Sequence, residues 1–217
     1  MSMNETARRL RAGALRLASF LPHRLRRLAA DERGMSAIEF GFVLPLMVTL
    51  YFGVVELSEG IAIDRKVTLT ARTIADLVSQ QSVALDTTTR DNLLNAAAAV
   101  IAPYPITNGA GTAVLKIVVS QIATDTSGNS TVQWSVTKNG TALTKNASYT
   151  LPAAYTVANT ASWIILGQAE YDYTPSFVGR FLVATSLTLT DRIYMRARQL
   201  NCIQYNDGST TTPSSPC

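Results

Sequence analysis

Histidine is almost absent from this chain of 217 residues. His23 is the only one, and it lies within the first 34 residues. Beyond that point no imidazole can serve as a general base, as part of a Ser-His-Asp triad or as a metal ligand. The sequence also lacks a phosphate-binding glycine loop and a dinucleotide-binding fingerprint. We therefore predict no enzymatic activity, no catalytic residue, no cofactor and no metal site.

Cysteine is scarce too, since Cys202 and Cys217 are the only two. Residues 203–216 between them are rich in Ser, Thr, Pro and Gly, so we expect a C-terminal tail that buries little. If this part of the chain is exported, an oxidising compartment favours a disulfide over two free thiols. A closed loop of this size would add about 3 kcal/mol of stability in the chain-entropy model.

Most of the chain carries no net positive charge. Residues 1–34 hold eight arginines and three acidic residues, a net charge of +5, so residues 35–217 carry a net charge of −1. A nearly neutral body lacks the basic patch of a nucleic-acid-binding domain, and we predict no nucleic-acid partner. Arginines that precede an apolar span keep their side of it in the cytoplasm.

That apolar span covers residues 36–55, in which Glu39 is the only charged side chain. Its length matches the roughly 20 residues that a helix needs to cross a bilayer. Its apolar residues lie all around the helix rather than along one stripe, which disfavours a buried core helix. A cleavable secretory signal would have a shorter apolar run ending at small residues. We therefore predict a retained transmembrane helix over residues 35–57.

Glu39 has two interpretations. A carboxylate at the centre of a membrane helix costs about 2.5–3.5 kcal/mol, and less near an end. Glu39 either reaches water at the cytoplasmic interface or meets a cation after assembly. If the chain is cut after Gly34, the new α-amino group of Met35 on a neighbouring subunit is such a cation. Gly34 and the basic leader favour the second interpretation.

Residues 31–45, DERGMSAIEFGFVLP, resemble the N-terminus of the TadE-like proteins. These are minor pilins, or pseudopilins, of the bacterial tight-adherence (Tad, Flp-type) pilus. The shared pattern is charged residues, Gly34, small residues, a Glu-Phe pair at Glu39, and an apolar run broken at Pro45. Glu56 matches the family's Gly-x-x-Glu at the outer end of the helix. The resemblance is specific over residues 31–56.

The resemblance implies a role in the assembly or initiation of a Tad-type pilus for surface adhesion. A prepilin peptidase would cut between Gly34 and Met35 and remove residues 1–34. The implied partners are this peptidase, other major and minor pilins, the inner-membrane assembly platform and the lipid bilayer. The chain would cross the bacterial inner membrane once, with its C-terminal domain in the periplasm or in the extracellular pilus. The alternative is an uncleaved, signal-anchored periplasmic binding domain, with an exported enzyme a distant third.

Pro45 lies inside the predicted helix, where it removes one backbone hydrogen bond and crowds the carbonyl group of Gly41. We expect a kink or a loosened turn there, which neighbouring groups can satisfy in a membrane. The alternative is that proline is simply more common in membrane helices than in soluble ones.

Two helices are expected. Apolar residues recur at helical spacing beyond the membrane, so a single helix of about 66 Å is predicted over residues 36–79. A second helix is predicted over residues 90–102, with Asp86 or Thr87 near its start and proline at its end. The predicted core-facing stripe of the first helix is Ile63, Val67, Ala71, Ile74 and Val78.

Four strands are expected at residues 114–122, 131–138, 162–173 and 185–198, with a hairpin turn at 125–129 and a loop at 139–159. On the last two strands, Arg192, Arg196 and Arg198 are predicted to pair with Glu170 and Asp172. The predicted fold is α+β: a long helix followed by an antiparallel sheet of about four strands, which the resemblance makes type IV pilin-like. The exported domain would span residues 58–201, with a disulfide-closed tail at 202–217.

Overall fold

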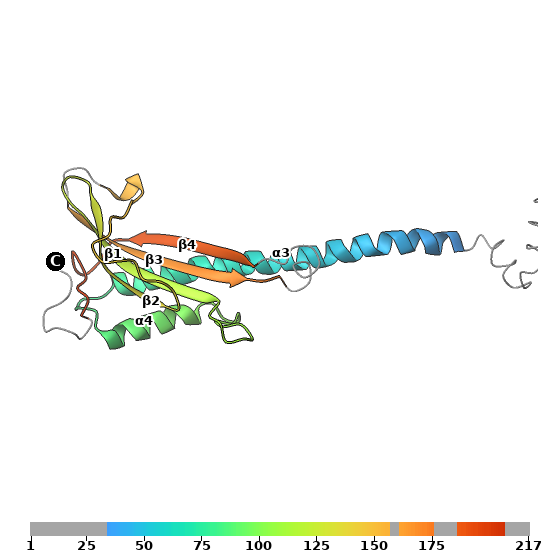
Figure 1. Cartoon of the computed structure of the whole chain (residues 1–217), viewed down its shortest axis with the longest axis horizontal. Helices are drawn as coiled ribbons and strands as arrows, with labels where there is room; N and C mark the ends of the chain where they lie inside the picture. The colour runs from blue at the N-terminus through green and yellow to red at the C-terminus, as the bar shows by residue number, and fades with distance from the viewer. Residues whose placement is uncertain (1–33, 157–160, 176–185, 207–217) are drawn as a thin grey trace, which may run out of the picture. The chain divides into compact units, whose positions relative to one another are not determined.

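The computed structural model describes residues 34–156, 161–175 and 186–206. They form, in order, α3 (Met35–Ser79), α4 (Thr87–Ala99), β1 (Leu115–Thr124), β2 (Ser130–Lys138), the 3-10 helix η2 (Ala153–Tyr155), β3 (Ser162–Tyr173) and β4 (Leu187–Met195) (Figure 1). The chain divides into two units, residues 1–51 and 52–217, and α3 belongs to both. The predicted α+β fold is confirmed.

Helix α3 begins and ends within one residue of its predicted bounds. The five residues of its predicted stripe, from Ile63 to Val78, are each no more than 1% exposed. Their spacing of three and four residues places them along one side of the helix, where they face the core. The outer half of α3 is therefore the amphipathic helix that its sequence predicts.

Helix α4 is capped at its start by Asp86, whose carboxylate accepts a hydrogen bond from the backbone N–H of Thr89 at 2.7 Å. Asp86 is one of the two residues predicted for this position. The helix ends at Ala99, three residues before the predicted end at residue 102. Residues 100–102 instead bond three residues back, because the ring of Pro103 disfavours a helical conformation in the residue before it.

The four strands form one antiparallel sheet in the order β2-β1-β3-β4. Each predicted strand is present, and β3 has the predicted bounds. The turn between β1 and β2 is closed by Asp125, whose carboxylate accepts hydrogen bonds from the backbone N–H groups of Ser127 and Asn129. Gly128 supplies the positive φ of 88° that this turn requires.

Both faces of the sheet are partly covered. The outer half of α3 and helix α4 lie on one face (Figure 1). The main core fills the space between these helices and the sheet. The closest approach is at Gly167 in β3, where an added Cβ atom would lie 2.5 Å from the backbone oxygen of Ala71. On the other face, a smaller core around Ile164 and Leu166 is covered by side chains from residues 143–155.

The predicted arginine pairs across β3 and β4 are wrong. The register places Thr190 opposite Glu170 and Thr188 opposite Asp172. Both carboxylates pair instead with Lys116 in β1, at 2.6 and 2.9 Å from its Nζ atom. β3 is a central strand, so its outward side chains have neighbours on two strands, and the lysine on β1 is the nearer cation.

The expectation that residues 203–216 bury little is also wrong for the first residue of that segment. Ile203 is fully buried, and its backbone N–H donates to the side chain of Gln121 at 2.7 Å. The indole N–H of Trp134 donates to the Ile203 carbonyl oxygen at 2.7 Å. These bonds hold Ile203 against β1 and β2, and backbone bonds to Leu85 hold Gln204 and Asn206. Residues 207–217 lie outside the described part of the chain.

Candidate functional site: the exposed N-terminal part of helix α3

Gly34 and Met35 stand at the start of α3, and both are exposed. An added Cβ atom at Gly34 would meet nothing within 4 Å. Packing therefore does not require a glycine at this position, and Gly34 also has no positive φ to explain it. Residues 1–33, which contain the arginines of the predicted leader, lie outside the described residues.

Glu39 lies on the exposed surface of α3, one turn after Met35. Residues four apart share one face of a helix, with a rise of about 6 Å between them. An amino group at Met35 and the Glu39 carboxylate would thus point to the same side of one helix. The same spacing also permits a pair within one subunit, so the pairing between neighbouring subunits stays a prediction.

The apolar side chains around Glu39 are exposed on every side of the helix. Phe42 is 80% exposed and Val48, the least exposed of the large ones over residues 35–51, is 39% exposed. Among the described residues, α3 is the one helix whose length and composition would let it cross a membrane, with a mean hydropathy of 2.0 in its most apolar window. The predicted membrane-capable helix is confirmed in this sense.

Two hydroxyl groups in this part of α3 are bonded within the helix. Thr49 Oγ1 donates to the carbonyl oxygen of Pro45 and Ser58 Oγ donates to that of Val54, both at 2.8 Å. Such bonds satisfy a hydroxyl group where water is lacking. Helix α3 runs through Pro45, and the kink expected there stays a prediction.

Glu56 lies at the other end of the apolar span, where the sheet meets the helix. Its carbonyl oxygen accepts a long hydrogen bond of 3.5 Å from the hydroxyl group of Tyr173 at the end of β3. The Tyr173 ring lies 3.6 Å from the Cβ position of Gly60. Burial, then the nearby carboxylates of Glu59 and Glu56, raise the pKa of Tyr173. Nothing in the sequence pattern placed Tyr173 at this turn of α3.

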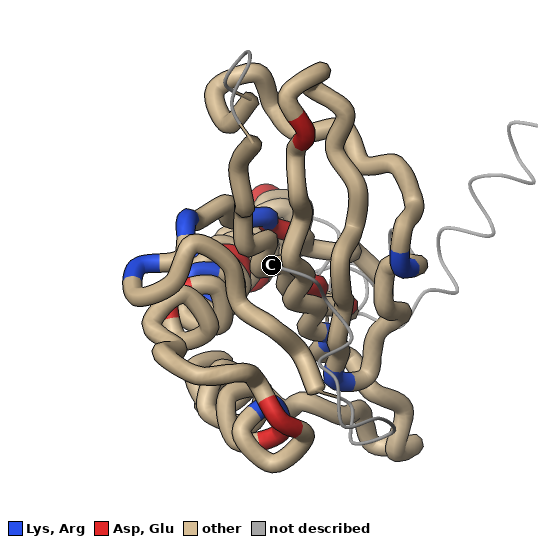
Figure 2. The backbone as a smooth tube through the Cα atoms, turned by 90° about the vertical axis from the view of Figure 1, so that its left-hand side faces the viewer, with Lys and Arg blue, Asp and Glu red and all other residues tan. Residues whose placement is uncertain are grey.

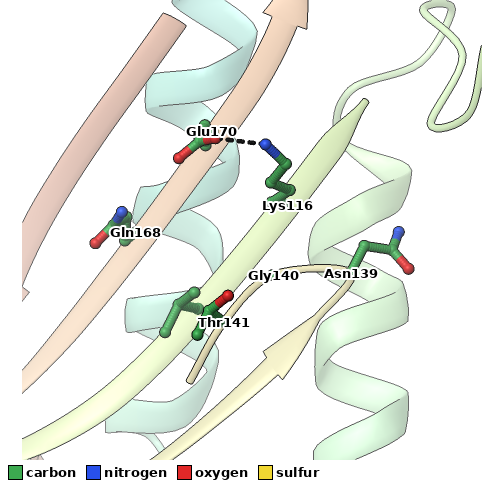
Figure 3. Close-up of a pocket in the computed structure, with 7 residues that line it drawn as sticks. Lys116, Asn139, Gly140, Thr141, Gln168 and Glu170 are labelled. Carbon is green, nitrogen blue, oxygen red and sulfur yellow. Dashed lines mark hydrogen bonds and ion pairs between the residues drawn. The ribbon is translucent and has the colours of Figure 1, made fainter. Parts of the chain in front are cut away.

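A polar hollow of about 370 Å³ lies on the face of the sheet away from the helices. Figure 3 shows Lys116 reaching to Glu170 above it, with Gln168, Asn139 and Thr141 around it. The two carboxylates hold the pKa of Lys116 above its usual value, Glu170 more than Asp172. Lys116, the cation among the residues that line the hollow, is thus neutralised by two carboxylates of the same sheet.

Other kinds of site find little support in the described residues. They contain no group of three His, Cys, Asp or Glu side chains that could hold a metal ion. Acidic and basic positions are both scattered over the domain in Figure 2. Cys202 is buried, whereas Cys217 lies outside the described residues, so their disulfide stays a prediction.

Comparison with known proteins agrees with the resemblance of the N-terminal segment. A family model described as TadE-like protein matches residues 34–76. A search of curated proteins and a search of solved structures each gave no match. The matched segment begins at Gly34 and includes the whole apolar span with Glu39 and Pro45. It continues through Glu56 and ends near the last turn of α3. Over residues 34–76, nearly the whole of helix α3, this chain is therefore similar to the TadE-like proteins.

Proposed function

We propose that the protein is a minor pilin, or pseudopilin, that takes part in the assembly or initiation of a Tad-type pilus. One observation carries the proposal: an exposed apolar helix with a single carboxylate, Glu39, near its start continues directly into the helix that supports the sheet. This arrangement presents an apolar segment to lipid or to other subunits while the domain stays folded. The TadE-like match over the same residues supports it.

Cleavage between Gly34 and Met35 is the first step of the proposed function. The fold does not need a glycine at residue 34, since a side chain there would meet nothing. A small residue is useful, however, where a peptidase must close around the backbone. Removal of residues 1–34 would leave a positive α-amino group at Met35, beside an otherwise apolar surface.

Glu39 then couples docking to charge neutralisation. In lipid, an unpaired carboxylate is disfavoured because desolvation penalises its charged form. Beside the Met35 amine of a neighbouring subunit, the charged form gains a partner in a dry environment. A correctly docked subunit therefore satisfies both groups, and a misplaced one leaves two charges unpaired.

A minor rather than a major subunit fits the size of the domain. Residues 58–201 are proposed as a periplasmic pilin-like domain, followed by the tail at 202–217 and preceded by the membrane helix at 35–57. A sheet with two helices on every subunit would crowd a thin filament, so an occasional or terminal place in the pilus suits this chain. Its proposed partners are the prepilin peptidase, other pilins and the inner-membrane assembly platform.

The test is the N-terminus of the protein isolated from membranes of its host. Intact mass and N-terminal sequencing should find Met35 as the first residue. Gly34→Val should block this cleavage because a branched side chain fills the peptidase's site. Gly53→Val is the matched control, since an added Cβ at Gly53 also meets nothing within 4 Å, and it should be cut normally.

Retention of residues 1–34 in the wild-type protein would contradict the pilin proposal. The alternative, an uncleaved signal-anchored periplasmic binding domain, would then stand. The polar hollow beside Lys116 is the observation that favours this alternative.

A further inference from the structure

The end of the sheet that holds Tyr173 lies beside residues 56–60 of α3, which directly follow the apolar span. β3 packs along α3 in the opposite direction: Gly167 lies against Ala71, whereas Tyr173 lies against Gly60 and bonds to the Glu56 carbonyl group. Figure 1 shows the arrowhead of β3 pointing along α3 in this way.

Helix and strand spacings agree with this arrangement. The six residues from Gly167 to Tyr173 advance by about 20 Å along a strand. On α3, the distance from Ala71 is about 17 Å to Gly60 and about 23 Å to Glu56. The strand therefore ends level with the first turn of α3 beyond the apolar run.

Exposed apolar side chains gather at this end of the domain. Leu187 begins β4 directly opposite Tyr173 and is 56% exposed. Ile106, 37% exposed, bonds through its carbonyl group to the backbone N–H of Leu115. The register then places Leu115 opposite Tyr171, two residues before Tyr173. We call Leu57, Glu59, Ile106 and Leu187 the proximal surface.

We infer that the proximal surface rests on the headgroup layer of the bilayer, so that the exported domain is held at the membrane before assembly. The inference rests on the proposed function, in which residues 35–57 cross the membrane. Three of its side chains are aliphatic and suit the boundary between headgroups and acyl chains, where apolar groups leave water. Glu59 is an exposed carboxylate, and at this level it would face the polar headgroups rather than the acyl chains, where a charge is disfavoured.

Lipid is the occupant that continuity with the apolar span favours. Leu57 is 65% exposed and lies on α3 only two residues beyond the end of the apolar run at Val55. Tyr173 lies beside Glu56 and Gly60 of α3, and Leu187 lies opposite Tyr173 in the sheet. Leu187 therefore lies close to the same height along the helix as Leu57. At the other end of the sheet, the turn at residues 125–129 lies about 36 Å away, since eleven residues of β3 separate the two ends.

The test uses the full-length chain in phosphatidylcholine vesicles that contain a lipid with a nitroxide quencher on its headgroup. Leu187→Trp is the reporter, and Ile106→Trp repeats the measurement at a second position. Val54→Trp reports on the span itself, and Ser127→Trp reports on the far end of the sheet. The native Trp134 and Trp163 pair with Gln121 and Ala123 in the far half, so the unaltered chain gives the background.

We expect the headgroup quencher to reduce the added emission of Leu187→Trp and Ile106→Trp as much as that of Val54→Trp. The Ser127→Trp emission should fall no more than the background. Equal quenching of Leu187→Trp, Ile106→Trp and Ser127→Trp, with Val54→Trp quenched, would overturn the inference and leave the proposed function intact. Failure to quench Val54→Trp would contradict the membrane span, and with it the proposed function.

A second copy of the chain is the competing occupant. In that case the Leu187→Trp emission would change with the ratio of protein to lipid, and the quencher would have no effect. This result would also overturn the inference.

Discussion

Glu39 is the residue on which the proposed assembly depends. Glu39→Gln keeps the shape and some of the hydrogen bonding but removes the charge that pairs with the Met35 amine. We expect the variant to insert and to be cleaved largely as the wild type, but to lose most piliation and most co-purification of assembly components. Glu39→Ala should act the same or worse.

The measurement is a count of pili, with co-purification, in a strain that lacks the native copy. Asp64→Asn is the matched control, because Asp64 is an exposed carboxylate on the same helix outside the apolar run, and it should assemble normally. Wild-type piliation in Glu39→Gln would mean that the carboxylate simply reaches the interface.

Gly167 is the residue on which close packing of helix and sheet depends. An added Cβ atom would lie 2.5 Å from the Ala71 oxygen and 2.9 Å from the Ala75 Cβ atom, so the strand and helix must separate. We expect Gly167→Ala to lower the free energy of unfolding by about 1–3 kcal/mol. Thermal unfolding of the detergent-solubilised chain measures this loss.

Gly109→Ala is the control for that change. An added Cβ at Gly109 meets nothing within 4 Å and the residue has no positive φ, so its effect should stay within about 0.5 kcal/mol. Equal stability of the two variants would show that the approach of β3 to α3 is looser than described.

At the scale of elements, Lys116 joins β1 to β3. Lys116 first, then Thr188, hold the pKa of Asp172 below its usual value. A carboxylate whose pKa is lowered by folding stabilises the protein at pH values above its unfolded pKa of about 3.9. This stabilisation is lost as the pH falls from that value through the lower pKa of the folded state. Because all three side chains are about 30% exposed, the network contributes only about 1 kcal/mol or less.

Lys116→Met should therefore lower stability at pH 6 and lose most of that effect at pH 3. The measurement is the difference in unfolding free energy between wild type and variant across this range. Arg196→Met removes an exposed cation for which the described residues show no ion pair, and its effect should not depend on pH in this way. A Lys116→Met effect of constant size would mean that the lysine acts only through packing.

At the scale of the whole molecule, the predicted disulfide would attach residues 207–217 to the domain. Cys202 precedes Ile203, which Gln121 and Trp134 hold by hydrogen bonds to its backbone. Non-reducing peptide mapping of exported protein should recover Cys202 linked to Cys217. Loss of the bond should loosen only the chain beyond the anchored residues and leave α3 unaffected. Complete alkylation of both thiols without reductant would contradict the pairing.

The sequence by itself determined the features that depend on neighbours along the chain. The stripe of α3 and the alternation of buried and half-buried residues in the second half of β3 follow from spacings of 3.6 and 2 residues, and the cap at Asp86 follows from its side chain. The junction at Gly34 and the apolar span with Glu39 are also local patterns. The family match over residues 34–76 begins at this junction.

Only the tertiary structure decided which distant residues meet. Strand order and register assigned Glu170 and Asp172 to Lys116 rather than to the arginines beyond them. Gln121 in β1 and Trp134 in β2 supplied the hydrogen bonds that hold the buried Ile203 in a segment of polar composition. The direction of β3 along α3 brought Tyr173 to Glu56. Such contacts depend on how whole elements pack, and the periodicity of a single segment does not contain that information.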